Sequence, residues 1–218
     1  MKRRNNILKI AIDSPAAAGA GTLAKAISKY YKLSYLDTGK IYRYIAYLKI
    51  KYPKKFNKQF LLLEIKNLKM KDLQNKNLLS DKIGSAASIV SKKKYIRKLV
   101  HSFQLNFAYN PSLKFKGSCL DGRDITYNIV PDADLKFYIT ANLKTRALRR
   151  FKELKKTNQN ITYDEVLKSI KKRDKSDFTR RISPLKKTKD SLLINTTNLT
   201  KRACFLKIKK IIDKKIKN

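Results

Sequence analysis

A run of small residues near the start of the chain constrains the fold more than any other feature. Residues 7–12 form a short apolar run of strand length, residues 13–21 are mostly small, and a helical pattern begins at Thr22. This order places the backbone N–H groups of the loop at the start of a helix, where they can bind phosphate oxygens. The sequence therefore predicts an α/β fold that begins with this strand, loop and helix.

The loop departs from the usual phosphate-loop pattern, GxxxxGK(S/T), at the first glycine and at the lysine. Ser14 stands in place of the first glycine, and Ala20 stands in place of the lysine. An ordinary turn of small residues between a strand and a helix fits the loop alone equally well, so the rest of the chain has to decide. The candidate phosphate-binding residues are Ser14, Pro15, Ala16, Ala17, Ala18, Gly19, Ala20, Gly21 and Thr22.

Strands and helices alternate along the rest of the chain. Further strands are expected at residues 33–36, 119–120, 135–140 and 192–194. Helices are expected at residues 41–48, in two pieces between 80 and 107 that break near 92–94, and at 143–156 and 200–216. Another helix begins after Thr162, which forms a capping box with Glu165. This alternation predicts a parallel sheet of about five strands covered on both faces. Residues 56–81 show no clear pattern and are interpreted as an insert.

The chain is strongly basic, with 53 Lys and Arg against 16 Asp and Glu and a formal net charge of +37. Such a charge is typical of proteins that bind nucleic acid or acidic membranes. The excess is mainly lysine, spread among isoleucine, asparagine and tyrosine, and AT-rich coding produces this mixture without selection for binding. A solvated basic surface is therefore the favoured interpretation, and a nucleic-acid partner is not expected.

The sequence carries no feature of an exported or membrane protein. Its apolar runs are all shorter than the roughly 18 residues that a membrane span needs. The basic start at residues 1–6 is not followed by the apolar region of a signal peptide. Cys119 and Cys204 are far apart and form no CxxC pattern, so neither a disulfide framework nor a zinc site is expected. We expect a cytoplasmic protein without a membrane partner.

Several short motifs follow the loop in a fixed order. They are Tyr35-Leu36-Asp37-Thr38-Gly39-Lys40-Ile41-Tyr42-Arg43, Ser85-Ala86-Ala87-Ser88, Asp121-Gly122-Arg123-Asp124, Pro131-Asp132-Ala133, Arg173-Asp174 with Asp177 and Arg180, and Ser183-Pro184-Leu185. With the loop, they resemble the cytidylate kinases, whose loop reads like D-G-P-S-G-x-G-K-G-T and is followed by Y-L-D-S-G-x-x-Y-R. Agreement at so many separated points, across nearly the whole chain, is not expected by chance.

The resemblance implies a three-layer P-loop NTPase-like fold in a single domain over residues 1–218. Its core would comprise residues 7–36, 114–141 and 190–218, with a reduced NMP-binding insert at 37–110 and a helical lid at 142–185. The implied activity is the ATP-dependent phosphorylation of CMP or dCMP to the diphosphate. The partners are then ATP, CMP and dCMP, and a monomer is expected. Mg²⁺ would be held mostly by nucleotide phosphates and water, with Thr22 as the nearest protein group.

The resemblance also assigns roles to side chains. Thr38 and Arg43 would hold the acceptor phosphate, because a guanidinium can fork two hydrogen bonds to it. The pocket for the cytosine base would be formed by Ser88, Arg97, Arg123 and Asp124. The lid would contribute Arg173, Asp177 and Arg180 to the acceptor or the transferring phosphate, and Arg146 or Arg150 to the ATP side. Plainer alternatives stay open: a solvated Arg43, a helix cap at Asp124, a surface cation at Arg97 and a basic helix face at Arg146, Arg149 and Arg150.

The chain also departs from the family pattern elsewhere. The family has Gly-Thr-Val after the Arg-Asp pair, where this chain has Ile125-Thr126-Tyr127-Asn128. The missing loop lysine removes a charge-assisted contact worth about 1.5–3 kcal/mol. Our hypothesis is that another cation replaces it, with Lys40 as the first candidate and Lys25 as the second. Two other classes stay open, a nucleotide-binding protein that has lost catalysis and a basic nucleic-acid-binding protein on the same scaffold. The retained arginines and aspartates favour an active enzyme.

Overall fold

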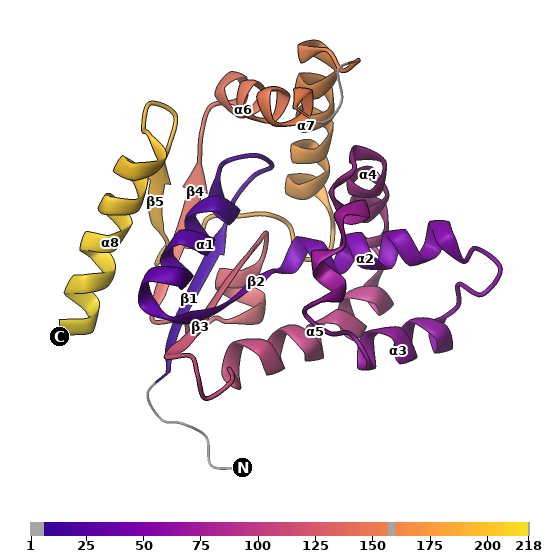
Figure 1. The fold of residues 1–218 in the computed structure, drawn as a ribbon, viewed down its shortest axis with the longest axis horizontal. Helices are drawn as coiled ribbons and strands as arrows, with labels where there is room; N and C mark the ends of the chain where they lie inside the picture. Colours follow the sequence, from indigo (N-terminus) through magenta and orange to yellow (C-terminus); the bar gives the residue numbers. More distant parts are fainter. Residues whose placement is uncertain (1–6, 157–159, 218) are drawn as a thin grey trace.

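Five parallel strands form one sheet in the computed structural model, within the part of the chain that it describes, residues 7–156 and 160–217 (Figure 1). The strand order is β2-β3-β1-β4-β5. The strands are β1 (Leu8–Asp13), β2 (Leu33–Asp37), β3 (Gly117–Gly122), β4 (Leu135–Thr140) and β5 (Leu192–Asn195). The predicted parallel sheet of about five strands is confirmed. The basic start at residues 1–6 lies outside the described residues.

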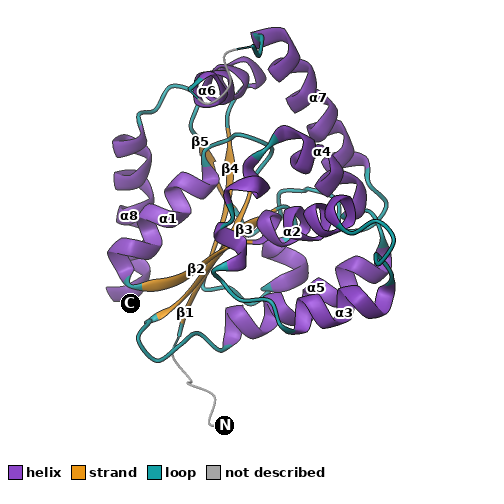
Figure 2. Ribbon diagram, turned by 45° about the vertical axis from the view of Figure 1, so that its right-hand side comes forward, coloured by secondary structure: helices purple, strands orange, loops and turns teal. Residues whose placement is uncertain are grey.

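Helices cover both faces of the sheet because alternate residues of its strands point to opposite sides. In the central strand, Ile10 and Ile12 pack in a core with helices α1 (Ala20–Tyr31) and α8 (Lys201–Lys217). Ala11 lies between them in sequence and packs in a second core with α2 (Thr38–Lys51) and α5 (Lys94–Tyr109). The result is the expected arrangement of three layers, with helices on either side of the sheet (Figure 2).

The remaining helices confirm most of the predicted boundaries. They are α3 (Lys58–Lys66), α4 (Asp81–Val90), α6 (Leu143–Lys155) and α7 (Tyr163–Thr179). The break expected near residues 92–94 lies between α4 and α5. The capping box is present at the start of α7, where the Thr162 hydroxyl accepts from the Glu165 N–H and the Glu165 carboxylate accepts from the Thr162 N–H.

The insert is helical. Residues 56–81 contain α3 and two short 3₁₀ turns, Asp72–Gln74 and Lys76–Leu79. The helical spacing was not visible in the sequence because α3 buries Leu61 and Ile65 but exposes Leu62 and Leu63, so its apolar residues form a continuous run. No strand is present among residues 38–110.

The segment that replaces the family's Gly-Thr-Val forms a single π-helical turn, Ile125–Ile129. The buried carboxylate of Asp13, at the end of β1, anchors this turn. Asp13 accepts hydrogen bonds from the N–H groups of Ile125 and Thr126, at 2.8 and 2.9 Å, and from the Thr126 hydroxyl at 2.6 Å. Burial raises the pKa of Asp13 to about 6, although these hydrogen bonds oppose the rise.

Among the described helices, none combines the length and the apolar character that crossing a membrane requires. Cys119 and Cys204 are free and buried.

Candidate active site

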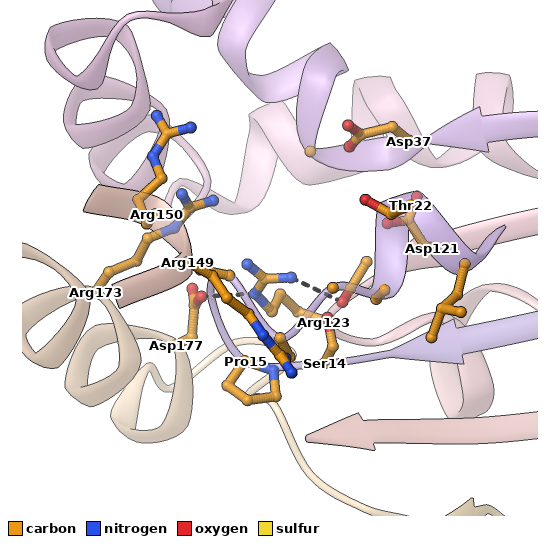
Figure 3. A pocket seen from close by; sticks show the side chains of 18 of the residues that line it. Ser14, Pro15, Thr22, Asp37, Asp121, Arg123, Arg149, Arg150, Arg173 and Asp177 are labelled. Atoms are coloured by element: carbon orange, nitrogen blue, oxygen red, sulfur yellow. Dashed lines mark hydrogen bonds and ion pairs between the residues drawn. The ribbon is translucent and has the colours of Figure 1, made fainter. Parts of the chain in front are cut away.

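A cavity of about 850 Å³ lies where the carboxyl ends of the strands meet (Figure 3). Ligand crevices of open parallel sheets form at this edge, because the loops that follow the strands converge there. Most of the site residues proposed from the sequence line this cavity. Those that line it are Ser14, Pro15, Ala17, Ala18, Gly19, Ala20, Gly21, Thr22, Thr38, Arg43, Ser88, Arg97, Arg123, Asp124, Arg150, Arg173, Asp177 and Arg180. Ala16, Lys40 and Arg146 are not among the lining residues.

The phosphate loop turns its N–H groups toward this cavity. Arg146 and Thr196 donate to the carbonyls of Ala16 and Ala18, at 2.9 and 3.2 Å, so these oxygens point into the protein. In the described part of the chain, no acceptor is paired with the N–H groups of residues 17–22. Such unpaired N–H groups at a helix start form a cradle for an anion, and this cradle does not require the missing lysine.

Two residues of the loop adopt the left-handed conformation. Gly19 has a φ of 88° and Ala17 has a φ of 58°. The family pattern has glycine at the position of Ala17, where a Cβ atom is disfavoured.

Replacing Ala17 by glycine is expected to raise the free energy of unfolding by roughly 0.5–1 kcal/mol. The relief of left-handed strain, about 1–2 kcal/mol, exceeds the added entropy of the unfolded chain, about 0.5–1 kcal/mol. Thermal unfolding should show a Tm about 1–4 °C higher. Ala18→Gly is the matched control and should lower the Tm, because Ala18 has no positive φ. The reverse order of the two variants would contradict this account.

One side of the cavity carries a cluster of arginines and one buried aspartate. Arg123 Nε donates to Asp177 at 2.8 Å, and Arg180 lies 3.6 Å from the same carboxylate. Arg180 Nε also donates to the Ser183 carbonyl at 2.6 Å. These arginines hold the pKa of Asp177 below its ordinary value, although burial alone would raise it. The carboxylate is therefore charged and fixes two guanidinium groups beside the cavity.

Arg173 differs from the other arginines of this cluster. Within residues 7–156 and 160–217 its guanidinium makes no hydrogen bond and no ion pair, yet Arg173 is partly buried and lines the cavity. Desolvation, followed by repulsion from Arg123, lowers the pKa of Arg173 to about 10. A cation held in this way has its donors available for an anion, and a bound phosphate would relieve the repulsion.

A second buried cluster surrounds Asp124. Its carboxylate pairs with Arg97, accepts from Asn128 Nδ2 at 2.8 Å and lies 3.8 Å from Arg180. The Arg97 guanidinium also lies 5.5 Å from the centre of the Tyr42 ring, in cation–π range. Arg97 and Asp124 are both buried, so neither is the surface cation or the simple helix cap that sequence left open.

The other acceptor-side candidates also have defined contacts. Arg43 donates to the carbonyls of Leu78 and Ser80, at 2.7 and 3.1 Å, and so is tied to the insert rather than solvated. The Thr38 hydroxyl donates to the Asp121 carbonyl at 2.8 Å. The hydroxyls of Ser88 and Ser176 lie 3.3 Å apart, which joins α4 to α7.

Of the three arginines of α6 considered for the ATP side, two line the cavity and one does not. Arg149 and Arg150 line the cavity. Arg149 donates to the hydroxyl and the carbonyl of Thr196, at 2.9 and 2.6 Å. Arg146 instead lies behind the loop, where it contacts Ala16 and Asp174. The sequence proposed Arg146 or Arg150 for the ATP side, and only Arg150 of these two reaches the cavity lining.

Sequence reasoning missed Asp37 and Asp121 as site residues. Both carboxylates lie near Thr22 at the ends of β2 and β3 (Figure 3). Burial, followed by repulsion from Asp37, raises the pKa of Asp121 well above its ordinary value. Both residues belong to the quoted motifs and follow buried strands, which was the available signal. No group of three or more His, Cys, Asp or Glu residues suited to a metal occurs in the described residues.

Comparisons with known proteins point to one family. The model of the cytidylate kinase family matches residues 10–214. A cytidylate kinase from Bartonella tribocorum is 41% identical over 209 residues, which are 95% of this chain and 95% of that protein. One from Mesomycoplasma hyopneumoniae is 38% identical over 221 residues, with 96% of this chain and 95% of that protein covered. An uncharacterized protein from Eubacterium ventriosum shares the fold, with a TM-score of 0.56 at 16% identity over 94% of this chain and 98% of that one. The chain therefore belongs to the cytidylate kinase family.

Proposed function

We propose that this protein transfers the γ-phosphoryl group of ATP to CMP or dCMP, giving ADP and the cytidine diphosphate. The observation that carries the proposal is a single cavity with phosphate-binding groups on two sides. The N–H groups of residues 17–22 lie on one side. On the other side, among further arginines, lies the guanidinium of Arg173, which is unpaired within the described residues. Phosphoryl transfer needs two phosphates in line and their charge neutralised, and this arrangement supports both.

In this proposal each group has a separate task. The loop binds the donor phosphates through its N–H groups. Thr38 and Arg43 hold the acceptor phosphate, while Arg173, with Arg123 and Arg180, stabilises charge on the transferring group. Asp177 positions Arg123 and Arg180.

The cytosine base is assigned to the cluster around Asp124. A serine hydroxyl, arginine donors and an aspartate acceptor can satisfy the carbonyl, ring nitrogen and amino group of cytosine. Ser88, Arg97 and Asp124 supply these groups in the cavity lining. A base with a carbonyl in place of that amino group would set an acceptor against the Asp124 carboxylate, so we expect UMP to be a poorer acceptor.

The residues near Thr22 fit a Mg²⁺ ion that arrives with ATP. Thr22 is exposed and lines the cavity. Burial, followed by repulsion from Asp37, raises the pKa of Asp121, and a nearby cation would relieve that repulsion. Mg²⁺ prefers oxygen ligands and usually keeps several waters, so few protein groups are needed. Mg²⁺ would supply charge neutralisation on the donor phosphates. Thr22, Asp37 and Asp121 would hold it or its waters.

Further parts of the proposal rest on the family. Residues 37–110 are assigned to the acceptor side, residues 142–185 to a lid, and residues 7–36, 114–141 and 190–218 to the core. A monomer in the cytoplasm suffices for the activity. The buried free cysteines are consistent with a reducing compartment.

A coupled assay of ADP formation tests the proposal directly. CMP, dCMP, UMP and AMP are each offered as acceptors with ATP and Mg²⁺. We expect turnover with CMP and dCMP, weaker turnover with UMP, and the least with AMP, whose purine base differs in size and shape from cytosine. Absence of turnover with every acceptor would rule out the kinase assignment and leave a nucleotide-binding protein without catalysis.

Three cations are candidates to replace the loop lysine. Lys40, the candidate from sequence, lies in the first turn of α2 and is outside the cavity lining, while Lys25 lines a separate hollow beside α1. Arg173 lines the main cavity and has no protein partner among the described residues. This geometry favours Arg173.

A further inference from the structure

One buried ion pair joins the lid helices to the phosphate loop. Arg146, in the first turn of α6, lies 2.6 Å from Asp174 on α7. The same two side chains bind both polar groups of one loop residue. Arg146 Nη1 donates to the Ala16 carbonyl at 2.9 Å, and Asp174 Oδ1 accepts from the Ala16 N–H at 3.1 Å. Both peptide groups that flank the Cα atom of Ala16 are therefore fixed from the lid.

The position of Arg146 is electrostatically unusual. A cation in the first turn of a helix is opposed by the helix dipole. Arg146 is also buried, with 8% of its side chain exposed, and Asp174 exposes 12%. A third hydrogen bond, from Arg146 Nε to the Ala141 carbonyl at 2.9 Å, completes its contacts. Buried ion pairs contribute little net stability compared with apolar packing, so stability alone does not account for this pair.

Apolar packing brings the same elements together. Ala16 is buried in a small core with Ala147 of α6 and with Val166 and Ile170 of α7. Figure 1 shows the loop before α1 reaching toward α6 and α7. Directly after Ala16, the chain turns into the left-handed conformation at Ala17 and then presents its unpaired N–H groups to the cavity. The orientation of these groups depends on where the Ala16 peptide is held.

We propose that Arg146 and Asp174 are positioning residues that clamp the donor phosphate loop to the lid helices and set the direction of its N–H groups. The expected effect of this clamp on catalysis rests on the proposed function. Neither side chain is required to touch a nucleotide, and Arg146 is outside the cavity lining. The clamp matters in this chain because its loop lacks both the lysine and the first glycine of the usual pattern.

The test compares Arg146→Ala and Asp174→Asn with the wild type in the full-length protein. We expect Arg146→Ala to raise KM for ATP about 10- to 100-fold, because small misplacements of a binding group have effects of this size. KM for CMP should change less than about threefold, since the acceptor contacts come from other elements. Asp174→Asn keeps an acceptor for the Ala16 N–H but loses the charge, so a smaller rise in KM for ATP is expected.

Two further readouts do not depend on turnover. Calorimetry with ADP should show weaker binding in both variants, and amide hydrogen exchange should be faster in peptides that cover residues 13–22. If the wild type shows no turnover, the proposed function fails, but ADP affinity and amide exchange still decide on the clamp. If Arg146→Ala does not fold, Asp174→Asn carries the same comparison.

Ile212→Ala is the matched control for a purely structural effect. Ile212 is fully buried in α8, in the core that β1 forms with α1 and α8, and it does not belong to the small core around Ala16. This variant should lower the Tm and leave KM for ATP, ADP affinity and loop exchange unchanged. A clamp variant that loses Tm in the same way, without a change in those three quantities, would overturn the proposal.

Discussion

Replacing Arg173 by alanine is expected to lower kcat for CMP phosphorylation about 100- to 1,000-fold, the usual cost of removing one donor that stabilises transition-state charge. Arg173 lines the cavity without a hydrogen bond or an ion pair to any residue in the described ranges, 7–156 and 160–217. Desolvation and the nearby Arg123 lower its pKa to about 10, so the guanidinium is still charged at neutral pH. The loss should fall on kcat more than on KM for ATP, because the charge it opposes develops during transfer.

The same experiment compares Arg173 with Lys40 as the cation that replaces the missing loop lysine. Because Lys40 does not line the cavity, Lys40→Ala should change kcat less than about threefold. Ala20 lines the cavity, so a lysine placed there can reach the phosphates. We therefore expect Ala20→Lys to restore at least about tenfold of the activity lost in Arg173→Ala, since one charge-assisted contact is worth about 1.5–3 kcal/mol.

Lys172→Ala provides the control on the same helix. Lys172 is exposed and does not line the cavity, so its replacement should leave kcat unchanged. A loss smaller than about threefold in Arg173→Ala would contradict the role given to this arginine. A larger loss in Lys40→Ala than in Arg173→Ala would assign the compensation to Lys40 instead.

Replacing Asp124 by alanine is expected to have the largest effect on stability among the site residues. The variant leaves Arg97 buried without its carboxylate and removes the nearby charge from Arg180. Breaking a buried ion pair by removing one partner costs about 3–5 kcal/mol. For a domain of this size the Tm should fall by about 6–20 °C. Thermal unfolding measures the shift, and kcat/KM for CMP should fall with it, because Asp124 lies in the proposed base pocket.

Asp190→Ala is the matched control for Asp124→Ala. Asp190 also pairs with a basic side chain, Lys136, but its own side chain is 58% exposed. Exposed pairs are worth about 0–1 kcal/mol, so the Tm should change by no more than about 4 °C. Equal shifts in the two variants would show that the cluster around Asp124 is not the buried network described above.

Much of the fold could be predicted because its signals are local. The capping box at Thr162 and Glu165 depends on residues three apart, and it is present as predicted. The strands were recognisable because buried parallel strands are continuous apolar runs. The helix α3 was missed for a physical reason as well, since its burial depends on contacts that Leu61 and Ile65 make elsewhere while Leu62 and Leu63 stay exposed.

The site was predicted as a set of residue types, but their contacts could not be. Arg146, Arg149 and Arg150 lie within about one turn of the same helix and look alike in sequence. Packing against α7 draws Arg146 behind the loop, while Arg149 and Arg150 face the cavity. Asp37 and Asp121 come from different strands, and their proximity exists only after β2 and β3 pair.

The sequence by itself determined the strand, loop and helix that begin the fold, the parallel sheet and the family. These follow from apolar spacing, capping and motif order, which all act over short stretches of chain. Only tertiary contacts set which arginine lines the cavity without an ion pair among the described residues, Arg173, and which one holds the loop, Arg146. Ion pairing at a buried site depends on distances between residues far apart in sequence, such as the 2.6 Å between Arg146 and Asp174, and only folding sets these distances.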